Sequence, residues 1–483
     1  MAEPLWTFDE VLAAMGGIAE GEGRPNIGQV AIDSRGIGAG ALFVAIKGDR
    51  LDGHQFVKAA IEAGAVASFV EHGANLRETG GVLIRTDDTL QALNMLGEAA
   101  RARAKAKVIA VTGSVGKTGT KEALRVALGA SGPTHVSQKS FNNLWGVPLS
   151  LANLPRDARF GVFEVGMNHA GEITPLTQMI RPDIAIITTV EPVHLEFFDS
   201  VEGIAEAKAE IFHGLEPGGT AILNSDSPFY DLLRGRAEDG GAGTILDFGS
   251  GAQAFARLGE TAFEADGSSV EAFIGDKRLA YRIGAPGRHL VLNSLAVLAA
   301  THAAGANLEK AAATLGVHGA QKGRGERSVI EVAGGEIAII DESYNANPAS
   351  MRAALMAMAH TPRKSFSRRV AVLGDMLELG QEGGALHRGL AEPVDAAGVD
   401  VVFACGPLMA ELYEALPKSR RGGYAETSEG LEPILIDAIN PGDVVMIKGS
   451  LGSRMGPLVE ALHRHLQGQG VARTEPVESR AGN

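Results

Sequence analysis

The hydrophobic positions of this chain gather in short β-branched runs, each followed by glycine or acidic residues and then by a segment rich in alanine and leucine. This alternation predicts parallel β-sheets with helices on both faces, and therefore an α/β fold. Because ligands gather at the carboxyl ends of parallel strands, we expect functional residues directly after these runs. The runs occupy residues 107–114, 159–166, 183–190, 220–226, 336–343, 369–375, 399–406 and 443–450.

Two breaks in this pattern predict three domains. Leu93, Leu96 and Ala100 share one face of a predicted helix that ends in a basic stretch before a new strand, which places a boundary near residue 105. The glycine- and charge-rich stretch HGAQKGRGERS places a second boundary near residue 320. We therefore predict domains at residues 1–104, 105–320 and 321–483, with a polar tail that frays from about Gln467.

Length, charge and cysteine content narrow the class of protein. A chain of 483 residues fits three domains of about 150 residues each. The charge balance, 44 − 58 = −14, argues against a nucleic-acid partner. The single cysteine, Cys405, fits a reducing compartment. The sequence MAEPLWTFDE lacks the pattern of a signal peptide, and no stretch has the apolar length of a membrane span. We therefore expect a cytoplasmic protein without membrane insertion.

The segment KVIAVTGSVGKTGTKEALRVAL predicts a strand, a glycine loop and a helix, as in phosphate-binding loops. Such a loop aims backbone N–H groups at phosphate oxygens, while Lys117 would reach the β- and γ-phosphates and the Thr118 hydroxyl could ligate Mg²⁺. Val111 occupies the first glycine position of G-x-x-x-x-G-K-[ST], so the motif has the shorter form T-G-S-x-G-K-T. The alternative is a glycine-rich turn with a surface lysine. The loop consists of Gly113, Ser114, Val115, Gly116, Lys117 and Thr118.

Two further residues could complete a metal site beside this loop. Glu164 ends one predicted strand, and His194 follows another. A carboxylate and an imidazole at these positions could bring oxygen and nitrogen ligands to Mg²⁺ ions that bridge the phosphates. Lys208, taken alone, predicts a solvated helix lysine near Glu206 and Glu210.

A set of motifs, found in this order along the chain, resembles the Mur ligases of peptidoglycan synthesis, and most closely their MurF type. The N-terminal AIDSRGIGAGALFVAIKGDRLDGHQF is similar to the UDP-binding domain of that type, and the resemblance extends from about residue 30 to 460. The motifs are TGSVGKTGTKEAL, FNNLWGVPLSL, EVGMNHAGEI, VEPVHLEFF, AKAEIF, LNSDSP, GRHLVLNSLAV, GRGE, DESYNANPASM, VLGDMLELG and KGS.

This resemblance implies an ATP-dependent ligase that adds D-alanyl-D-alanine to UDP-N-acetylmuramoyl-tripeptide through an acyl phosphate, for cell wall biogenesis, cell shape and cell division. It implies a small α/β UDP-substrate-binding domain, a central P-loop-type ATP-binding domain with a parallel sheet, and a Rossmann-like C-terminal ligase domain. The partners would be these two substrates, and we expect a monomer.

The resemblance also implies roles for individual residues. Two Mg²⁺ ions would lie among Thr118, Glu164, His194 and Lys208, the last converted by CO₂ into a carbamate. Lys117, Lys208, His194 and Glu164 would be catalytic. The nucleotide site would comprise Gly113 to Gly119, with Asn293, Arg324 and Asp341 at the adenine and across the cleft. Substrate binding would use Ser34, Arg35, Asn142, Asn143, Tyr344 and Asn345.

Four positions depart from the family pattern. Val115 and Gly119 replace an Asn and a Thr of the loop, and Leu451 and Gly456 stand where the family often has Arg and Glu. Other functions stay open: a nucleotide-driven switch or transport ATPase, a non-catalytic UDP-sugar-binding module, and a MurE-type ligase that adds diaminopimelate or lysine. The MurE type carries a D-N-P-R string, which this chain lacks. Folylpolyglutamate synthetases share the loop but not the DSR domain.

Overall fold

The computed structural model describes residues 3–48, 51–76, 79–138, 140–193, 195–264, 266–317 and 319–469. Contacts within the chain define two compact units. The first comprises Met1–Thr189, Ala205–Arg257 and Leu295–Ala311, and the second comprises Val190–Ile204, Leu258–Ser294 and Ala312–Asn483. In the described ranges, no helix has the length and apolar character needed to cross a membrane.

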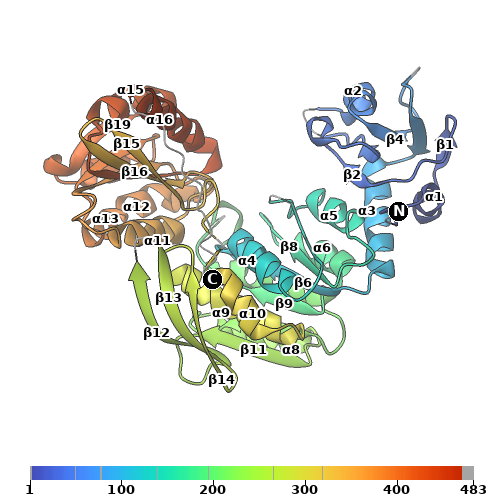
Figure 1. Cartoon of the computed structure of the whole chain (residues 1–483), viewed down its shortest axis with the longest axis horizontal. Helices are drawn as coiled ribbons and strands as arrows, with labels where there is room; N and C mark the ends of the chain where they lie inside the picture. Colours follow the sequence, from blue (N-terminus) through green and yellow to red (C-terminus); the bar gives the residue numbers. More distant parts are fainter. Residues whose placement is uncertain are drawn as a thin grey trace, which may run out of the picture. The chain divides into compact units, whose positions relative to one another are not determined.

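The N-terminal part of the first unit is a five-stranded sheet in the order β1-β5-β4-β3-β2, parallel except for β1. Alternate residues of β3 face opposite sides: Leu42 and Val44 pack against α1 and α3, whereas Phe43 packs against α2. In Figure 1, α3 lies alongside α5 and α6, the helices of the next sheet. The elements are α1 (Phe8–Met15), β1 (Ile18–Glu20), β2 (Gln29–Ala31), β3 (Ala41–Val44), α2 (Val57–Glu62), β4 (Ala65–Glu71), β5 (Val82–Thr86) and α3 (Thr89–Arg103).

The central part of the first unit contains six parallel strands in the order β11-β10-β9-β6-β8-β7. Their carboxyl ends carry the glycine loop and Glu164, as the sequence predicts. The strands are β6 (Lys107–Thr112), β7 (Thr134–Val136), β8 (Phe160–Glu164), β9 (Ile184–Ile187), β10 (Thr220–Asn224) and β11 (Thr244–Gly249). The helices of the first unit here are α4 (Lys117–Gly129), α5 (Gly146–Ala152), α6 (Ile173–Ile180) and α8 (Tyr230–Asp239). Three further helices have residues in both units: α7 (Val201–Ala209), α9 (Arg288–Ala303) and α10 (Leu308–Leu315).

A three-stranded meander continues the chain after β11. Strand β12 (Ala256–Glu264) pairs with β11 in the first unit and then runs into the second, where β13 (Gly267–Ile274) and β14 (Lys277–Ile283) follow as an antiparallel hairpin. A two-residue Gly–Asp turn joins these strands, with Gly275 at φ +57°. The β-branched runs above do not include these three strands.

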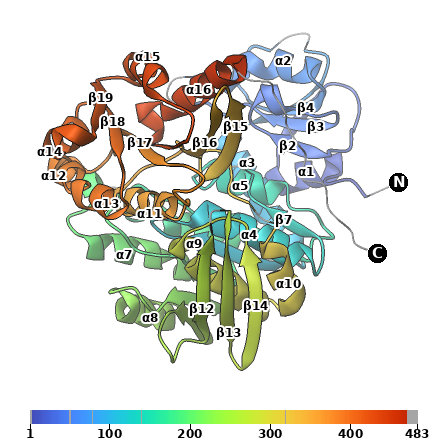
Figure 2. The same ribbon diagram turned by 60° about the vertical axis from the view of Figure 1, so that its left-hand side comes forward.

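The C-terminal part of the second unit is a six-stranded sheet in the order β15-β16-β20-β17-β18-β19, with β15 alone antiparallel. Figure 2 shows α15 and α16 on the opposite face of this sheet from α11 and α13. The strands are β15 (Glu326–Val332), β16 (Gly335–Glu342), β17 (Arg368–Gly374), β18 (Val401–Cys405), β19 (Arg421–Ala425) and β20 (Asp443–Lys448). The helices are α11 (Pro348–Ala359), α12 (Gly383–Arg388), α13 (Ala391–Ala396), α14 (Ala410–Ala415), α15 (Ser428–Ala438) and α16 (Met455–Gln469).

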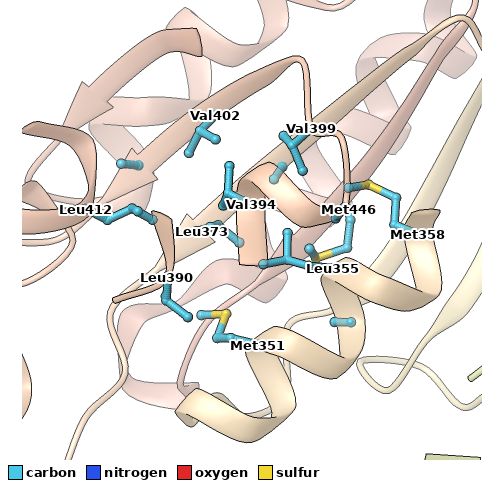
Figure 3. Packing of buried hydrophobic residues seen from close by; sticks show 14 of the residues in the cluster. Met351, Leu355, Met358, Leu373, Leu390, Val394, Val399, Val402, Leu412 and Met446 are labelled. Carbon is cyan, nitrogen blue, oxygen red and sulfur yellow. The ribbon is translucent and has the colours of Figure 1, made fainter. Parts of the chain in front are cut away.

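Strand β17 separates two cores. Leu373 packs with Met351 and Leu355 of α11 in one of them (Figure 3), whereas Val370 and Val372 face the other. This arrangement agrees with the predicted α/β class. The proposed boundaries near residues 105 and 320 fall between α3 and β6 and between α10 and β15. Helix α16 ends at Gln469, close to the residue from which the tail is predicted to fray, and positions 470–483 lie outside the described residues.

The α11 core yields a stability prediction. Leu355 is fully buried, while its neighbour Met356 is 42% exposed. Leu355→Ala leaves a cavity and should lower the free energy of unfolding of this domain by about 2–5 kcal/mol. Met356→Ala is the control and should change it by less than about 0.5 kcal/mol. Denaturant titration followed by circular dichroism measures both, and equal effects would contradict the packing described.

Candidate active site

The loop between β6 and α4 has the geometry of a phosphate cradle. Gly113 and Gly116 take φ values of +146° and +91°, which L side chains rarely adopt. A Cβ on Gly113 would lie 2.0 Å from the Thr188 hydroxyl oxygen, so glycine is required there. Lys117 folds back over the loop and donates from Nζ to the Gly113 carbonyl at 2.6 Å. The loop thus places a cation and a helix N-terminus together, which favours anion binding.

The Glu164 carboxylate lies beside this loop and is 1% exposed. It accepts hydrogen bonds from the Thr118 hydroxyl at 2.9 Å and from the Asn142 side-chain amide at 2.8 Å. The structure therefore brings together three residues that the sequence predicted separately. A carboxylate and a hydroxyl supply the hard oxygen ligands that Mg²⁺ prefers, so this pair fits the ion.

Lys121 is a neighbour of Glu164 that the sequence analysis missed. It is fully buried, donates from Nζ to the Ser137 carbonyl at 2.7 Å, and lies 3.9 Å from a Glu164 oxygen. Its position in the sequence could have revealed this burial. Lys121 shares one face of α4 with Leu124 and Leu128, and that spacing predicts an apolar residue. A lysine in a buried stripe needs a charged or polar partner, and the carboxylates of Glu122, at 3.3 Å, and Glu164 supply the charge.

Lys208, on α7, is 2% exposed. Burial, together with the positive charge of Lys117, holds the pKa of Lys208 well below its ordinary value, which favours the neutral amine. Glu206 pairs with Arg236 instead, at 2.7 and 2.8 Å, and Glu210 accepts from the Gly171 backbone N–H at 2.6 Å. The interpretation of Lys208 as a solvated helix lysine near these carboxylates is therefore wrong.

The remaining predicted metal ligand, His194, lies outside the described residues. Among those that are described, no three His, Cys, Asp or Glu side chains gather as a metal cage. Mg²⁺ at phosphate sites takes one or two carboxylates and completes its shell with phosphate and water oxygens, so Thr118 and Glu164 suit that mode.

A separate pocket of about 750 Å³ lies in the N-terminal part of the first unit. Ser34 and Arg35 line it, and the Arg35 guanidinium hydrogen-bonds the Asp33 carboxylate at 2.7–3.2 Å. This ion pair raises the pKa of Arg35 further, so the pocket keeps a cation at its rim. Most of the lining is apolar and includes four aromatic side chains: Phe43, Phe56, Phe141 and Trp145.

Among the predicted residues of the second unit, Asp341, Tyr344 and Asn345 lie at the carboxyl end of β16. Arg324 lies in the turn before β15, and Asn293 lies on α9. The Arg324 guanidinium stacks over the Tyr344 ring at 4.2 Å. Asp341 accepts from the Gly323 backbone N–H at 3.0 Å and so holds the turn that carries Arg324. Asn345 contributes its carbonyl, which accepts from Lys448 Nζ at 2.8 Å. Asn293 lies on α9, where its neighbour Ser294 bonds the Tyr281 hydroxyl at 2.7 Å.

Comparison with known proteins identifies the family. Residues 26–112 match the Mur ligase family catalytic domain, 111–301 the Mur ligase middle domain, and 323–451 the Mur ligase glutamate ligase domain. The UDP-N-acetylmuramoyl-tripeptide--D-alanyl-D-alanine ligase of Rickettsia prowazekii is 32% identical over 458 residues, which is 94% of this chain and 99% of that protein. The chain belongs to the Mur ligase family.

Solved structures place this Mur ligase with the MurF type. MurF from Acinetobacter baumannii is 29% identical, with a TM-score of 0.81 over 96% of this chain and 99% of that one. MurF from Thermotoga maritima in complex with ADP is 26% identical, with a TM-score of 0.75 over 92% and 98%. The predicted three-domain α/β architecture and the resemblance to MurF-type ligases are confirmed.

The loop of this Mur ligase offers a matched pair of variants. Gly113→Ala forces a Cβ into the Thr188 hydroxyl and should abolish ADP binding, because the loop must shift. Gly119→Ala is the control: a Cβ there meets open space within α4, so the variant should bind ADP normally and gain about 0.5–1 kcal/mol of stability. Calorimetric titration with Mg·ADP measures the affinity. Normal binding by Gly113→Ala would contradict the assigned loop geometry.

Proposed function

We propose that this Mur ligase joins D-alanyl-D-alanine to UDP-N-acetylmuramoyl-tripeptide in an ATP-dependent reaction of peptidoglycan precursor synthesis. The products are UDP-N-acetylmuramoyl-pentapeptide, ADP and phosphate. One observation carries the proposal: a phosphate loop, a buried Thr118–Glu164 pair and a buried Lys208 lie in one compact unit of a chain that matches the Rickettsia ligase over nearly its whole length.

The chemistry requires activation of the tripeptide carboxylate. That carboxylate attacks the γ-phosphate of ATP to give an acyl phosphate, and the amine of D-alanyl-D-alanine then displaces phosphate through a tetrahedral intermediate. Negative charge grows first on the transferring phosphoryl oxygens and then on the oxyanion. Lys117 and the N-terminus of α4 supply fixed positive charge for these steps.

Thr118, Glu164 and His194 would hold magnesium, which supplies charge neutralisation at the phosphates when bound. The hydrogen bond from Asn142 fixes one Glu164 oxygen, while the other faces Thr118. This arrangement orients the carboxylate before any ligand arrives, so little reorganisation is left for the reaction.

Lys208 supports a carbamate as a further anionic ligand. A neutral amine can attack the carbon of CO₂ and release one proton, which leaves a negatively charged N-carboxylate. The low pKa of Lys208 provides that neutral amine, and no carboxylate of the described residues competes for it by ion pairing. Conversion to an anion would also relieve the repulsion between Lys208 and Lys117.

The substrate residues divide between the two units. In the first unit, Ser34 and Arg35 would bind the uridine diphosphate at the 750 Å³ pocket, and Asn142 and Asn143 the reacting end. In the second, Asn293, Arg324 and Asp341 would serve the nucleotide, and Tyr344 and Asn345 the substrate. A location in the cytoplasm and a monomeric state stay predictions from the sequence.

The test of the proposal is substrate dependence. Phosphate release should require UDP-N-acetylmuramoyl-tripeptide and rise sharply with D-alanyl-D-alanine, because the acyl phosphate turns over only when the amine arrives. Each substrate is omitted in turn. The MurE-type alternative is tested with diaminopimelate or lysine as the amine and a UDP-N-acetylmuramoyl substrate that carries only two amino-acid residues. Equal hydrolysis with neither substrate would favour an ATPase of unrelated role. Lys117→Ala is the blank and should lose all phosphate release.

A second prediction concerns Lys208. Lys208→Ala should lower turnover by about 100-fold or more, because it removes the anionic ligand. Acetate or formate should partly restore it by filling the vacated position. The control, Arg236→Ala, breaks only the exposed pairs with Glu206 and Asp239 and should leave turnover unchanged. Steady-state kinetics with and without added acetate or formate measure the turnover. A concentration of about 100 mM is used, because it would saturate a site that binds with millimolar affinity. Wild-type turnover in Lys208→Ala would refute the carbamate.

A further inference from the structure

Trp145 combines an exposed aromatic face with a fixed backbone. Its side chain is 38% exposed, lines the 750 Å³ pocket, and approaches Gly48 so closely that a Cβ there would lie 3.2 Å from the indole ring. Trp145 belongs to the segment Phe141–Trp145, which directly precedes α5 of the central part, whereas Gly48 belongs to the N-terminal sheet region. The pocket is therefore closed on one side by residues of the ATP-binding part of the chain.

The same five-residue segment also reaches the Glu164 carboxylate. Asn142 donates to Glu164 through its side chain and accepts from the Gly166 backbone N–H at 2.8 Å through its carbonyl. The Asn143 side chain accepts from the backbone N–H groups of Trp145 and Gly146 at 3.2 and 3.0 Å. These bonds leave the segment little freedom, so the position of the indole depends on the anchor at Glu164.

We propose that Trp145 contacts the uracil ring of the UDP substrate and that the Asn142–Glu164 hydrogen bond positions it there. The inference rests on the proposed function. Flat aromatic faces stack on bases without needing hydrogen-bond readout, and Arg35 at the rim complements the diphosphate. One short segment then serves both the substrate pocket and the carboxylate beside the phosphate loop.

Intrinsic fluorescence gives a direct readout, because the chain contains two tryptophans and Trp6 is 2% exposed. Titration of the full-length protein with UDP, without magnesium or ATP, should change the emission of the wild type. Trp145→Phe should remove that change while it keeps most of the affinity, since a phenyl ring still stacks. A wild-type signal that persists in Trp145→Phe would overturn the proposed contact.

Affinity measurements by calorimetry test the energetic role. Trp145→Ala should weaken UDP binding about tenfold, in the range that base stacking commonly contributes. Leu144→Ala is the matched control, because Leu144 is 52% exposed, adjacent in sequence and absent from the pocket lining. Unchanged UDP affinity in Trp145→Ala would refute the contact.

Asn142→Ala tests the positioning role, because Asn142 does not line the pocket. The substitution should shift the Trp145 emission before any ligand is added and should weaken UDP binding several-fold. UDP lacks the reacting peptide end, so this loss would reflect the position of Trp145 and not a lost contact at that end. Normal UDP affinity and emission in Asn142→Ala would overturn the positioning role. Failure of the wild type to bind either UDP or UDP-N-acetylmuramoyl-tripeptide would instead refute the proposed function, and this inference with it.

Discussion

The burial of the Glu164 carboxylate is the constraint on which the site depends. Removing an ionised group from water is costly unless hydrogen bonds and opposite charge replace its hydration. Thr118 and Asn142 supply the hydrogen bonds, and Lys121 supplies the charge at 3.9 Å. These partners come from α4 and from the segment before α5, so satisfying one carboxylate fixes the phosphate loop and that segment together.

Two buried lysines of the same unit show opposite solutions to the same problem. Lys121 is compensated by the Ser137 carbonyl and by the neighbouring carboxylates of Glu122 and Glu164. Lys208 faces another cation, Lys117, and its low pKa follows from burial and that repulsion. A lysine kept neutral is a nucleophile, whereas a paired lysine is not. The difference lies in their surroundings and not in the residue type.

The sequence predicted the parallel strands, the glycine loop and the position of Glu164, because β-branched runs and strand-end glycines report local structure directly. It did not predict β12 to β14, although the Gly–Asp turn before Lys277 and the alternation after it are hairpin signals. Lys121 was missed, and the interpretation of Lys208 as a solvated lysine was wrong. The burial of Lys121 could have been inferred from its spacing with Leu124 and Leu128 on α4. The burial of Lys208 depends on segments far away in the chain, so spacing within its own helix does not reveal it.

Two of the four departures from the family pattern, Val115 and Gly119, fall where the main chain, and not the side chain, determines the geometry. The Thr188 hydroxyl donates to the Val115 carbonyl at 2.6 Å, and the Ser114 backbone N–H donates to the Thr189 carbonyl at 2.8 Å. Both bonds are indifferent to the side chain at position 115. A Cβ at position 119 would border open space, so no packing contact depends on the residue type there. A phosphate loop acts mainly through backbone N–H groups and its lysine, and both changes leave those groups in place.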